Sequence, residues 1–219
     1  MRTKICGIRN EKDALVAIKA GANAVGFLVG ITHVAEDKIN EKEAQDIIFN
    51  LPPFISSVMV THLTKKEDIV DLAKYLNVNT IQIHDYIPPA DVIYVRNKMG
   101  NCKIIKAIHV MEEHESLEMM HSFESTCDAL LLDSRTKDRL GGTGMVHDWN
   151  ISKKIISLSK IPVILAGGLT DENVYDAVVK TTPFGVDVNS GVEVDGWKDS
   201  KKVSKFINDA IRAELNTND

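Results

Sequence analysis

The chain has 219 residues, of which 44% are hydrophobic and 26% are charged, and its formal net charge is −5. This composition is ordinary for a globular protein with a substantial core, and the acidic balance argues against a nucleic-acid partner. No apolar run approaches the roughly 18 residues that a membrane span needs, so we expect no membrane partner.

The start of the chain and its cysteines indicate a cellular compartment. The opening residues MRTKICGI enter a strand-like pattern directly, without the features of a secretory signal peptide. The three cysteines, Cys6, Cys102 and Cys127, are few and unevenly spaced, which is typical of reduced thiols and not of a disulfide framework. We therefore expect a cytoplasmic protein.

Short apolar runs recur along the whole chain and predict buried strands. Most are β-branched and apolar on both faces, as the strands of a parallel sheet covered on both sides should be. In chain order they are TKICGI (3–8), AVGFLVGI (24–31), ISSVMVTH (55–62), TIQIH (80–84), KIIKAIHV (103–110), DALLLD (128–133), PVILAGG (162–168) and PFGVDVNSG (183–191).

Amphipathic segments separate these runs and predict helices. Thr64 and Thr170 stand where a side chain can cap the first amides of two of them. In chain order the predicted helices are Glu11–Ala20, Glu41–Asn50, Lys65–Leu76, Pro89–Lys98, Glu113–Phe123, Trp149–Leu158, Asp171–Lys180 and Trp197–Arg212.

Eight strand–helix units with short connections predict an α/β fold, a single-domain (β/α)8 TIM barrel that spans residues 1–219. Eight parallel strands can close on themselves and leave no unpaired edge. The alternative is a doubly wound open sheet. Residues 214–219 are expected to form a disordered tail.

Two glycine-containing loops follow the last two predicted strands. Gly167 and Gly168 close the seventh strand, and Asn189, Ser190 and Gly191 close the eighth. Glycines let the backbone approach an anion closely, and the unpaired amides near a helix start supply hydrogen-bond donors. Because barrel enzymes repeatedly bind phosphate after strands seven and eight, these loops predict a small phosphorylated substrate.

Six stretches together resemble one known family. They are KICGI at the first strand, GANAVGF at the second, IQIH at the fourth, LLLDS…GGTG…DW at the sixth, PVILAGGLTDENV at the seventh and GVDVNSGVE at the eighth. In order and spacing they are similar to phosphoribosylanthranilate isomerase, the barrel enzyme of tryptophan biosynthesis. The resemblance covers nearly the whole chain.

The resemblance implies an Amadori rearrangement of N-(5-phosphoribosyl)anthranilate to 1-(2-carboxyphenylamino)-1-deoxyribulose 5-phosphate without any cofactor. It implies Cys6 as the general base and Asp133 as the general acid, with Gly142 and Gly144 shaping the loop beside the acid. His84, from IQIH, is expected to contact the substrate. A monomer or a homodimer is compatible with this reading.

The two proton-transfer groups need opposite adjustments of their pKa. A thiol at its reference pKa of about 8.5 is only a few per cent thiolate at neutral pH, so Cys6 needs a cation or helix-end amides nearby. Asp133 is expected to be buried, so that its pKa rises and it holds a proton.

The loop after the second strand departs from the family pattern. The family usually ends this loop with Ser-Pro-Arg, whose arginine holds the anthranilate carboxylate, whereas this chain has Glu36 and Asp37 there. An acid repels that carboxylate. Lys38 is the expected substitute, with Arg9 and Arg135 as alternatives, although a flexible ammonium matches a planar carboxylate less well than a guanidinium does.

Four histidines fall at or just past the ends of consecutive predicted strands: His33, His62, His84 and His109. Strand tips that are neighbours in a barrel lie close together, and imidazoles with carboxylates are ligands for Zn²⁺ or a similar divalent metal. The alternative function is therefore a metal-dependent epimerase, aldolase or isomerase that acts on another phosphorylated sugar. Ordinary hydrogen bonds to loops or substrate are the competing explanation for these histidines.

Overall fold

The computed structural model describes residues 1–32, 35–136, 139–140 and 147–217. Within them, eight parallel strands form the centre of the molecule. The strands are β1 (Arg2–Ile5), β2 (Ala24–Leu28), β3 (Ser56–Thr61), β4 (Thr80–Ile83), β5 (Lys103–Val110), β6 (Ala129–Thr136), β8 (Val163–Leu165) and β9 (Gly185–Val188).

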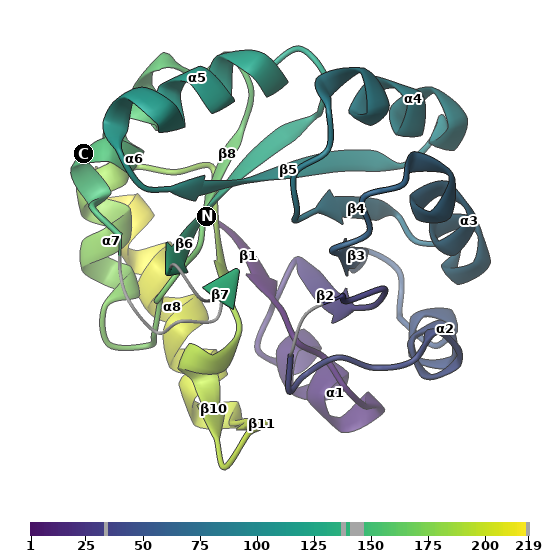
Figure 1. Ribbon diagram of the computed structural model, residues 1–219. Helices are drawn as coiled ribbons and strands as arrows, with labels where there is room; N and C mark the ends of the chain where they lie inside the picture. Colours follow the sequence, from purple (N-terminus) through teal and green to yellow (C-terminus); the bar gives the residue numbers. More distant parts are fainter. Residues whose placement is uncertain (33–34, 137–138, 141–146, 218–219) are drawn as a thin grey trace.

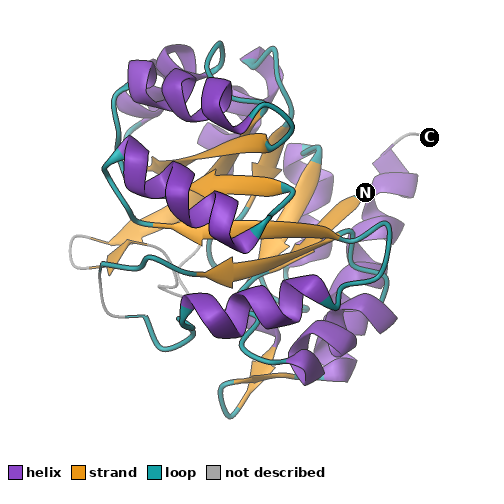
Figure 2. Ribbon diagram, turned by 90° about the vertical axis from the view of Figure 1, so that its right-hand side faces the viewer, coloured by secondary structure: helices purple, strands orange, loops and turns teal. Residues whose placement is uncertain are grey.

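The helices lie outside these strands and surround them (Figure 1, Figure 2). They are α1 (Glu11–Lys19), α2 (Glu41–Phe49), α3 (Lys66–Leu76), α4 (Pro89–Met99), α5 (Glu113–Phe123), α6 (Trp149–Leu158), α7 (Val174–Thr181) and α8 (Ser200–Thr217). None of the described helices is both long enough and apolar enough to cross a membrane.

The sheet closes on itself. Its strand order is β5-β4-β3-β2-β1-β9-β8-β6, and a further pairing joins β5 to β6. The predicted barrel is therefore confirmed, and the open-sheet alternative is wrong. Closure also fixes two registers that matter below: Lys4 lies opposite Asp187, and His109 lies opposite Asp133.

Short elements follow the strands at the carboxyl end of the barrel. The strand β7 (Arg139–Leu140) pairs antiparallel with β6, and the single 3₁₀ turn η1 (Ser190–Val192) follows β9. A hairpin of β10 (Glu193–Val194) and β11 (Trp197–Lys198) comes next.

The last helix differs from its sequence prediction at both ends. It begins at Ser200 and not at Trp197, because Trp197 belongs to the hairpin and the Asp199 carboxylate accepts hydrogen bonds from the amides of Lys201 and Lys202. At its other end the helix continues to Thr217, so residues 214–217, which were expected to be a disordered tail, are helical.

Local capping explains several helix starts. Asn10 caps α1 by accepting a hydrogen bond from the amide of Asp13, and Asn40 forms a capping box with Glu43 at α2. Thr170 accepts hydrogen bonds from the two amides that lead into α7, as predicted. The predicted cap at Thr64 is wrong, because Lys65 is the N-cap of α3 and makes no capping bond.

The strands have an outer and an inner face. The outer faces pack against the helices in one large hydrophobic core, whereas two smaller clusters contain only residues of strands and of the loops that follow them. These smaller clusters fill the inside of the barrel. Three buried polar side chains, Lys4, Gln82 and Asp187, lie on the same inner faces, where apolar side chains are the rule.

Candidate active site

Polar side chains gather at the carboxyl ends of the barrel strands. Cys6 directly follows β1, and His84 directly follows β4. His109 and Asp133 lie near the ends of β5 and β6, and Asn189 follows β9. Because parallel strands end on the same side of a barrel, these residues share one mouth, which is where barrel enzymes carry out their chemistry.

One side of the mouth holds the thiol. Cys6 is 5% exposed, and its sulfur and the ammonium of Lys4 lie beside the same point of β2, at Gly26. The Lys4 Nζ lies 2.8 Å from Asp187 Oδ2, and both residues are buried. We call Cys6, Lys4 and Asp187 the thiol side of the mouth.

Burial and charge oppose each other on the thiol side. Burial raises the pKa of the Cys6 thiol to about 11, and the nearby carboxylates of Asp187 and Asp37 add to this, while the Lys4 ammonium acts against it. Burial by itself would lower the pKa of Lys4, but Asp187 and the Cys6 sulfur outweigh burial and raise that pKa. Burial raises the pKa of Asp187.

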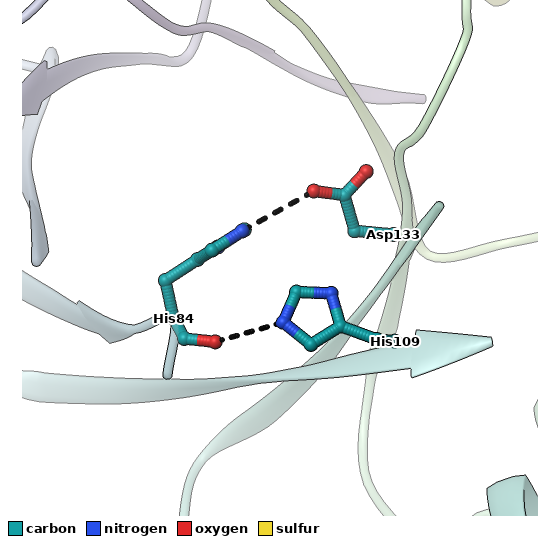
Figure 3. Close-up of side chains that lie close together, drawn as sticks. All are labelled: His84, His109 and Asp133. Carbon is teal, nitrogen blue, oxygen red and sulfur yellow. Dashed lines mark hydrogen bonds and ion pairs between the residues drawn. The ribbon is translucent and has the colours of Figure 1, made fainter. Parts of the chain in front are cut away.

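The opposite side of the mouth holds the carboxyl group (Figure 3). His84 Nε2 lies 3.4 Å from Asp133 Oδ2, and His109 Nε2 donates a hydrogen bond of 3.2 Å to the backbone oxygen of His84. Asp133 also accepts a hydrogen bond of 2.7 Å from the amide of Ser134 through its other oxygen. We call His84, His109 and Asp133 the carboxyl side.

The protonation states on the carboxyl side follow from these contacts. Burial acts to raise the pKa of Asp133, but the hydrogen bond from His84 and the charges of both histidines outweigh burial, so the pKa is lowered. The expectation that Asp133 rests in its protonated form is therefore wrong. Burial, followed by the charge of His84, lowers the pKa of His109 to about 4, so this imidazole is neutral at neutral pH.

The hydrogen bonds also assign tautomers. A carbonyl oxygen only accepts, so His109 carries its proton on Nε2, and its buried Nδ1 is an acceptor without a hydrogen-bond partner among the described residues. Gln82 Nε2 lies 3.2 Å from His84 Nδ1, and the Gln82 Oε1 atom is buried without such a partner. Turning that amide by 180° would place Oε1 against a protonated Nδ1, so the Gln82 side chain can serve either charge state of His84.

The glycine loops after β8 and β9 are packed tightly. Gly167 and Gly168 have φ angles of +76° and +67°, which favour glycine. A Cβ on Gly167 would lie 2.4 Å from the amide nitrogen of Ser134, and one on Gly191 would lie 1.9 Å from the backbone oxygen of Leu169. These glycines therefore let stretches of backbone pack closely against each other, and Gly167 does so beside Asp133; phosphate binding at these loops stays a prediction.

The Asn189 side chain is already occupied. Its amide nitrogen donates to the carboxylate of Asp37, and its oxygen accepts a hydrogen bond of 2.8 Å from Lys198 Nζ. Lys198 in turn pairs with Glu193 at 2.6 Å. The predicted contact of Asn189 with phosphate stays a prediction, and it would have to use the backbone amide.

Two of the three cations expected to replace the family arginine, Lys38 and Arg9, have described side chains, and these lie in different places. Lys38 is exposed and lines a cleft of about 510 Å³ beside α2 and α3, together with Gly30 and Tyr75. The Arg9 guanidinium lies 4.1 Å from the centre of the Trp197 ring. The side chain of Arg135 lies outside the described part of the chain.

Three of the four predicted metal-ligating histidines come together. The rings of His62 and His84 stack with their centres 5.0 Å apart, and His84 and His109 meet edge to face at the same separation. Ligand atoms of His84, His109 and Asp133 lie within 4.8 Å of one another. His33 lies outside the described residues, as do Gly142 and Gly144 of the loop after β6.

Sequence reasoning missed Lys4, Asp187 and Gln82. Each stands inside an apolar strand pattern, in TKICGI, GVDVN and TIQIH. A charged or amide side chain in a strand that is otherwise apolar on both faces is the signal that could have found them, because such a strand has no exposed face for it.

Comparisons with known proteins agree on one family. A sequence model described as N-(5'phosphoribosyl)anthranilate (PRA) isomerase matches residues 3–209. The N-(5'-phosphoribosyl)anthranilate isomerase 2 of Methanosarcina mazei is 42% identical over 213 residues, which cover 96% of this chain and 94% of the relative. The isomerase of Methanosarcina acetivorans is 38% identical over 218 residues, which cover 94% and 91%.

Solved structures give the same result. The phosphoribosyl anthranilate isomerase of Thermotoga maritima superimposes with a TM-score of 0.84 at 34% identity, covering 97% of this chain and 99% of that one. A second structure, of a phosphoribosyl anthranilate isomerase in complex with reduced 1-(o-carboxyphenylamino)-1-deoxyribulose 5-phosphate, superimposes with a TM-score of 0.81 at 32% identity and the same coverage.

Proposed function

Since the chain belongs to the N-(5'-phosphoribosyl)anthranilate isomerase family and catalyses that isomerisation in tryptophan biosynthesis, we propose that Cys6 and Asp133 transfer the protons. The observation that carries the assignment is their placement. The thiol and the carboxyl group stand at the ends of β1 and β6, on opposite sides of one mouth, and each has a charged or titratable partner of its own, Lys4 or His84.

The reaction needs an acid and a base in turn. Asp133, once protonated, gives its proton to the ring oxygen of the ribose, and the sugar opens to an imine that is protonated on nitrogen. The Cys6 thiolate then removes the proton from C2′ to give an enolamine. The proton that Cys6 holds moves to C1′ and the 2′-hydroxyl proton goes to the Asp133 carboxylate, which yields the ketose and restores both groups.

Because its pKa is lowered, Asp133 rests as a carboxylate and has to take up a proton before the ring opens. His84 Nε2 is the adjacent donor, 3.4 Å from the carboxylate, and the reversible amide of Gln82 accommodates His84 with or without its second proton. We therefore assign to His84 the delivery of the proton to Asp133 when the substrate displaces water from the mouth.

The phosphate of the substrate is proposed to bind at the loops after β8 and β9. Gly167, Gly168, Ser190 and Gly191 supply backbone amides there, and the left-handed glycines let the chain approach the anion. The loop that contains Gly142 and Gly144 belongs to the same proposal.

The proposed chemistry moves only protons, so we propose an enzyme without a cofactor. We also propose that it works in the cytoplasm on one small phosphorylated substrate. A metal requirement of this same isomerisation is the second candidate, because His84, His109 and Asp133 offer three ligand atoms within 4.8 Å of one another. The oligomeric state, monomer or homodimer, is measured by size-exclusion chromatography with light scattering.

Loss of substrate fluorescence tests the assignment directly. Cys6→Ser and Asp133→Asn should each lower kcat by about 10²–10⁴, the usual contribution of a general acid or base. The matched controls are Cys102→Ser, at a half-buried thiol far along the chain, and Asp91→Asn, at a carboxylate that pairs with Lys66 between outer helices. Turnover within tenfold of wild type in either test variant would remove that residue from the mechanism.

The same assay separates the two candidate functions. The metal-free isomerase should turn over phosphoribosylanthranilate equally well before and after treatment with a chelator. Activity that disappears with the chelator and returns with Zn²⁺ would favour the metal-dependent candidate.

A further inference from the structure

A buried ion pair lies inside the barrel directly beneath the thiol. Lys4 and Asp187 are only 4% and 7% exposed, and they lie opposite each other in the register of β1 and β9. Burying two charges costs several kcal/mol per ion, and apolar residues of similar volume often stabilise a protein as well or better. Stability alone therefore does not explain why this barrel holds a charged pair where apolar layers are usual.

The pair is arranged around the Cys6 sulfur. Lys4 precedes Cys6 by two residues on β1, so both side chains point to the inner face. A Cβ on Gly26 of β2 would lie 2.8 Å from the Cys6 sulfur and 3.1 Å from Lys4 Nζ, so glycine at this position leaves room for the two groups to meet. The Lys4 ammonium thus donates a hydrogen bond to Asp187 Oδ2 and lies on the same side of the barrel interior as the Cys6 sulfur, whose charge acts on it.

We propose that Lys4 and Asp187 relay the proton of the Cys6 thiol, an inference that rests on the proposed role of Cys6 as the base. One of the three Nζ–H bonds of Lys4 breaks as its proton moves to Asp187 Oδ2, and the electron pair left on Nζ takes the proton of the thiol as the Sγ–H bond breaks. The thiol, ammonium and carboxylate become a thiolate, an ammonium and a carboxylic acid. The net charge of the three groups stays at zero, and no other reactant takes part.

Asp187 is suited to receive that proton. Burial raises its pKa, and its second oxygen, Oδ1, is buried without a hydrogen-bond partner among the described residues. The carboxylate is therefore held by fewer donors than a buried anion needs, and protonation relieves this deficit.

Other charged groups face the relay and set its balance. Asp37, from the loop between β2 and α2, acts on Cys6 and disfavours the thiolate. Asp133 and His84, across the mouth, act on Asp187 in opposite directions: the carboxylate raises its pKa and the imidazole lowers it. Because the transfer is internal, these groups change the thiolate fraction without making that fraction follow the pH of the solvent.

The pH dependence of Cys6 alkylation tests the relay without using turnover. Wild-type protein is treated with iodoacetamide between about pH 6 and about pH 8, and modification of Cys6 is followed by peptide mass spectrometry. A thiolate formed by internal transfer gives a rate that is flat over this range, whereas a thiol that loses its proton to solvent reacts about tenfold faster per pH unit below its pKa. Cys102 in the same sample is the internal control and should show the tenfold slope.

Two variants complete the test. Asp187→Asn keeps the cation but cannot accept a proton, so its Cys6 rate should gain the tenfold slope. If that variant does not fold, the double variant Lys4→Met with Asp187→Leu replaces the pair by apolar side chains. At neutral pH its Cys6 should react at least tenfold more slowly than that of wild type. The rate should also rise about tenfold per pH unit, as expected for Asp187→Asn. Circular dichroism confirms the fold of each variant.

A wild-type rate that rises tenfold per pH unit, or a flat rate in either variant, overturns the relay. Neither result bears on whether Cys6 is the base, because the Cys6→Ser turnover measurement decides that separately.

Discussion

The two sides of the mouth surround the proposed proton-transfer groups, Cys6 and Asp133, with different partners. The thiol side uses a buried ion pair: Lys4 and Asp187 lie 2.8 Å apart inside the barrel, below the mouth. The carboxyl side uses imidazoles at the rim, with His84 3.4 Å from Asp133 and His109 bonded to the backbone of His84. One side is built from a lysine–carboxylate pair inside the barrel, and the other from imidazoles beside a carboxylate at the rim.

The difference matches what each group has to become. A buried thiol favours its neutral form, so it needs a cation that stays charged throughout the reaction. A carboxyl group that gives away a proton and takes one back needs a neighbour that can exchange protons, which an imidazole does. The comparison predicts that damage to the thiol side is costly for stability, whereas damage to the carboxyl side changes mainly the response to pH.

The largest effect is expected from breaking the ion pair. Lys4→Met leaves Asp187 buried and uncompensated, so the free energy of unfolding should fall by about 3–5 kcal/mol. Adding Asp187→Leu removes the stranded charge and should recover most of that loss. Urea denaturation at neutral pH measures both quantities.

Lys66→Met is the matched control, because it removes a lysine from an ion pair with Asp91 that is accessible to solvent. Its effect on stability should be far smaller than that of Lys4→Met. If the double variant is as unstable as Lys4→Met alone, the barrel interior requires the charges themselves. The predicted difference in stability between the two sides would then be wrong.

A smaller effect is expected on the carboxyl side, and it should depend on pH. The pKa of His109 is lowered to about 4 in the folded protein. In the unfolded chain it returns to about 6.5. Between these two values the unfolded state binds the proton and the folded state does not, so stability falls as the pH falls through this window.

Between about pH 6.5 and about pH 4, the free energy of unfolding should therefore fall less in His109→Asn than in wild type, by an amount on the order of 1–3 kcal/mol. Urea denaturation at several pH values measures the difference, in which the contributions of unaltered groups such as Asp187 largely cancel. His114→Asn, at an exposed position of α5, is the control and should parallel wild type. If the free energy of unfolding of wild type and of His109→Asn depends on pH in the same way, the pKa of His109 is not lowered in the folded protein.

The barrel was predictable from sequence for physical reasons, and so was the position of Cys6 and Asp133 at the carboxyl ends of two of its strands. Eight apolar runs at regular spacing have few other ways to bury both faces, and Cys6 and Asp133 stand in motifs that a close family shares. The ion pair was not predictable, because Lys4 and Asp187 are 183 residues apart and meet only once β1 and β9 close the barrel.

The charge state of Asp133 also could not be predicted from the sequence. Burial alone argues for a raised pKa, and the sequence predicted this, but the hydrogen bond from His84 reverses the direction. Which histidine reaches which carboxylate depends on neighbouring strand ends in three dimensions. The gathering of His62, His84 and His109 could be predicted from strand order, whereas their individual partners could not.

The smallest effect is expected at the rim, outside both sides of the mouth. Lys38 was predicted to hold the substrate carboxylate, but its side chain is exposed and lines the cleft that it shares with Gly30 and Tyr75. An exposed flexible ammonium contributes little to binding a planar carboxylate. Lys38→Met should therefore change KM for phosphoribosylanthranilate by no more than about twofold, because the loss of a weak, screened charge contact is worth well under 1 kcal/mol.

Steady-state kinetics at low ionic strength gives this test its greatest sensitivity, since salt screens contacts between exposed charges. Lys42→Met removes a neighbouring exposed lysine on α2 and controls for the general field of the surface. A tenfold rise in KM for Lys38→Met alone, with kcat unchanged, would place this lysine in uniform substrate binding. The mouth would then have a third functional region, at the loop after β2, in addition to the thiol and carboxyl sides.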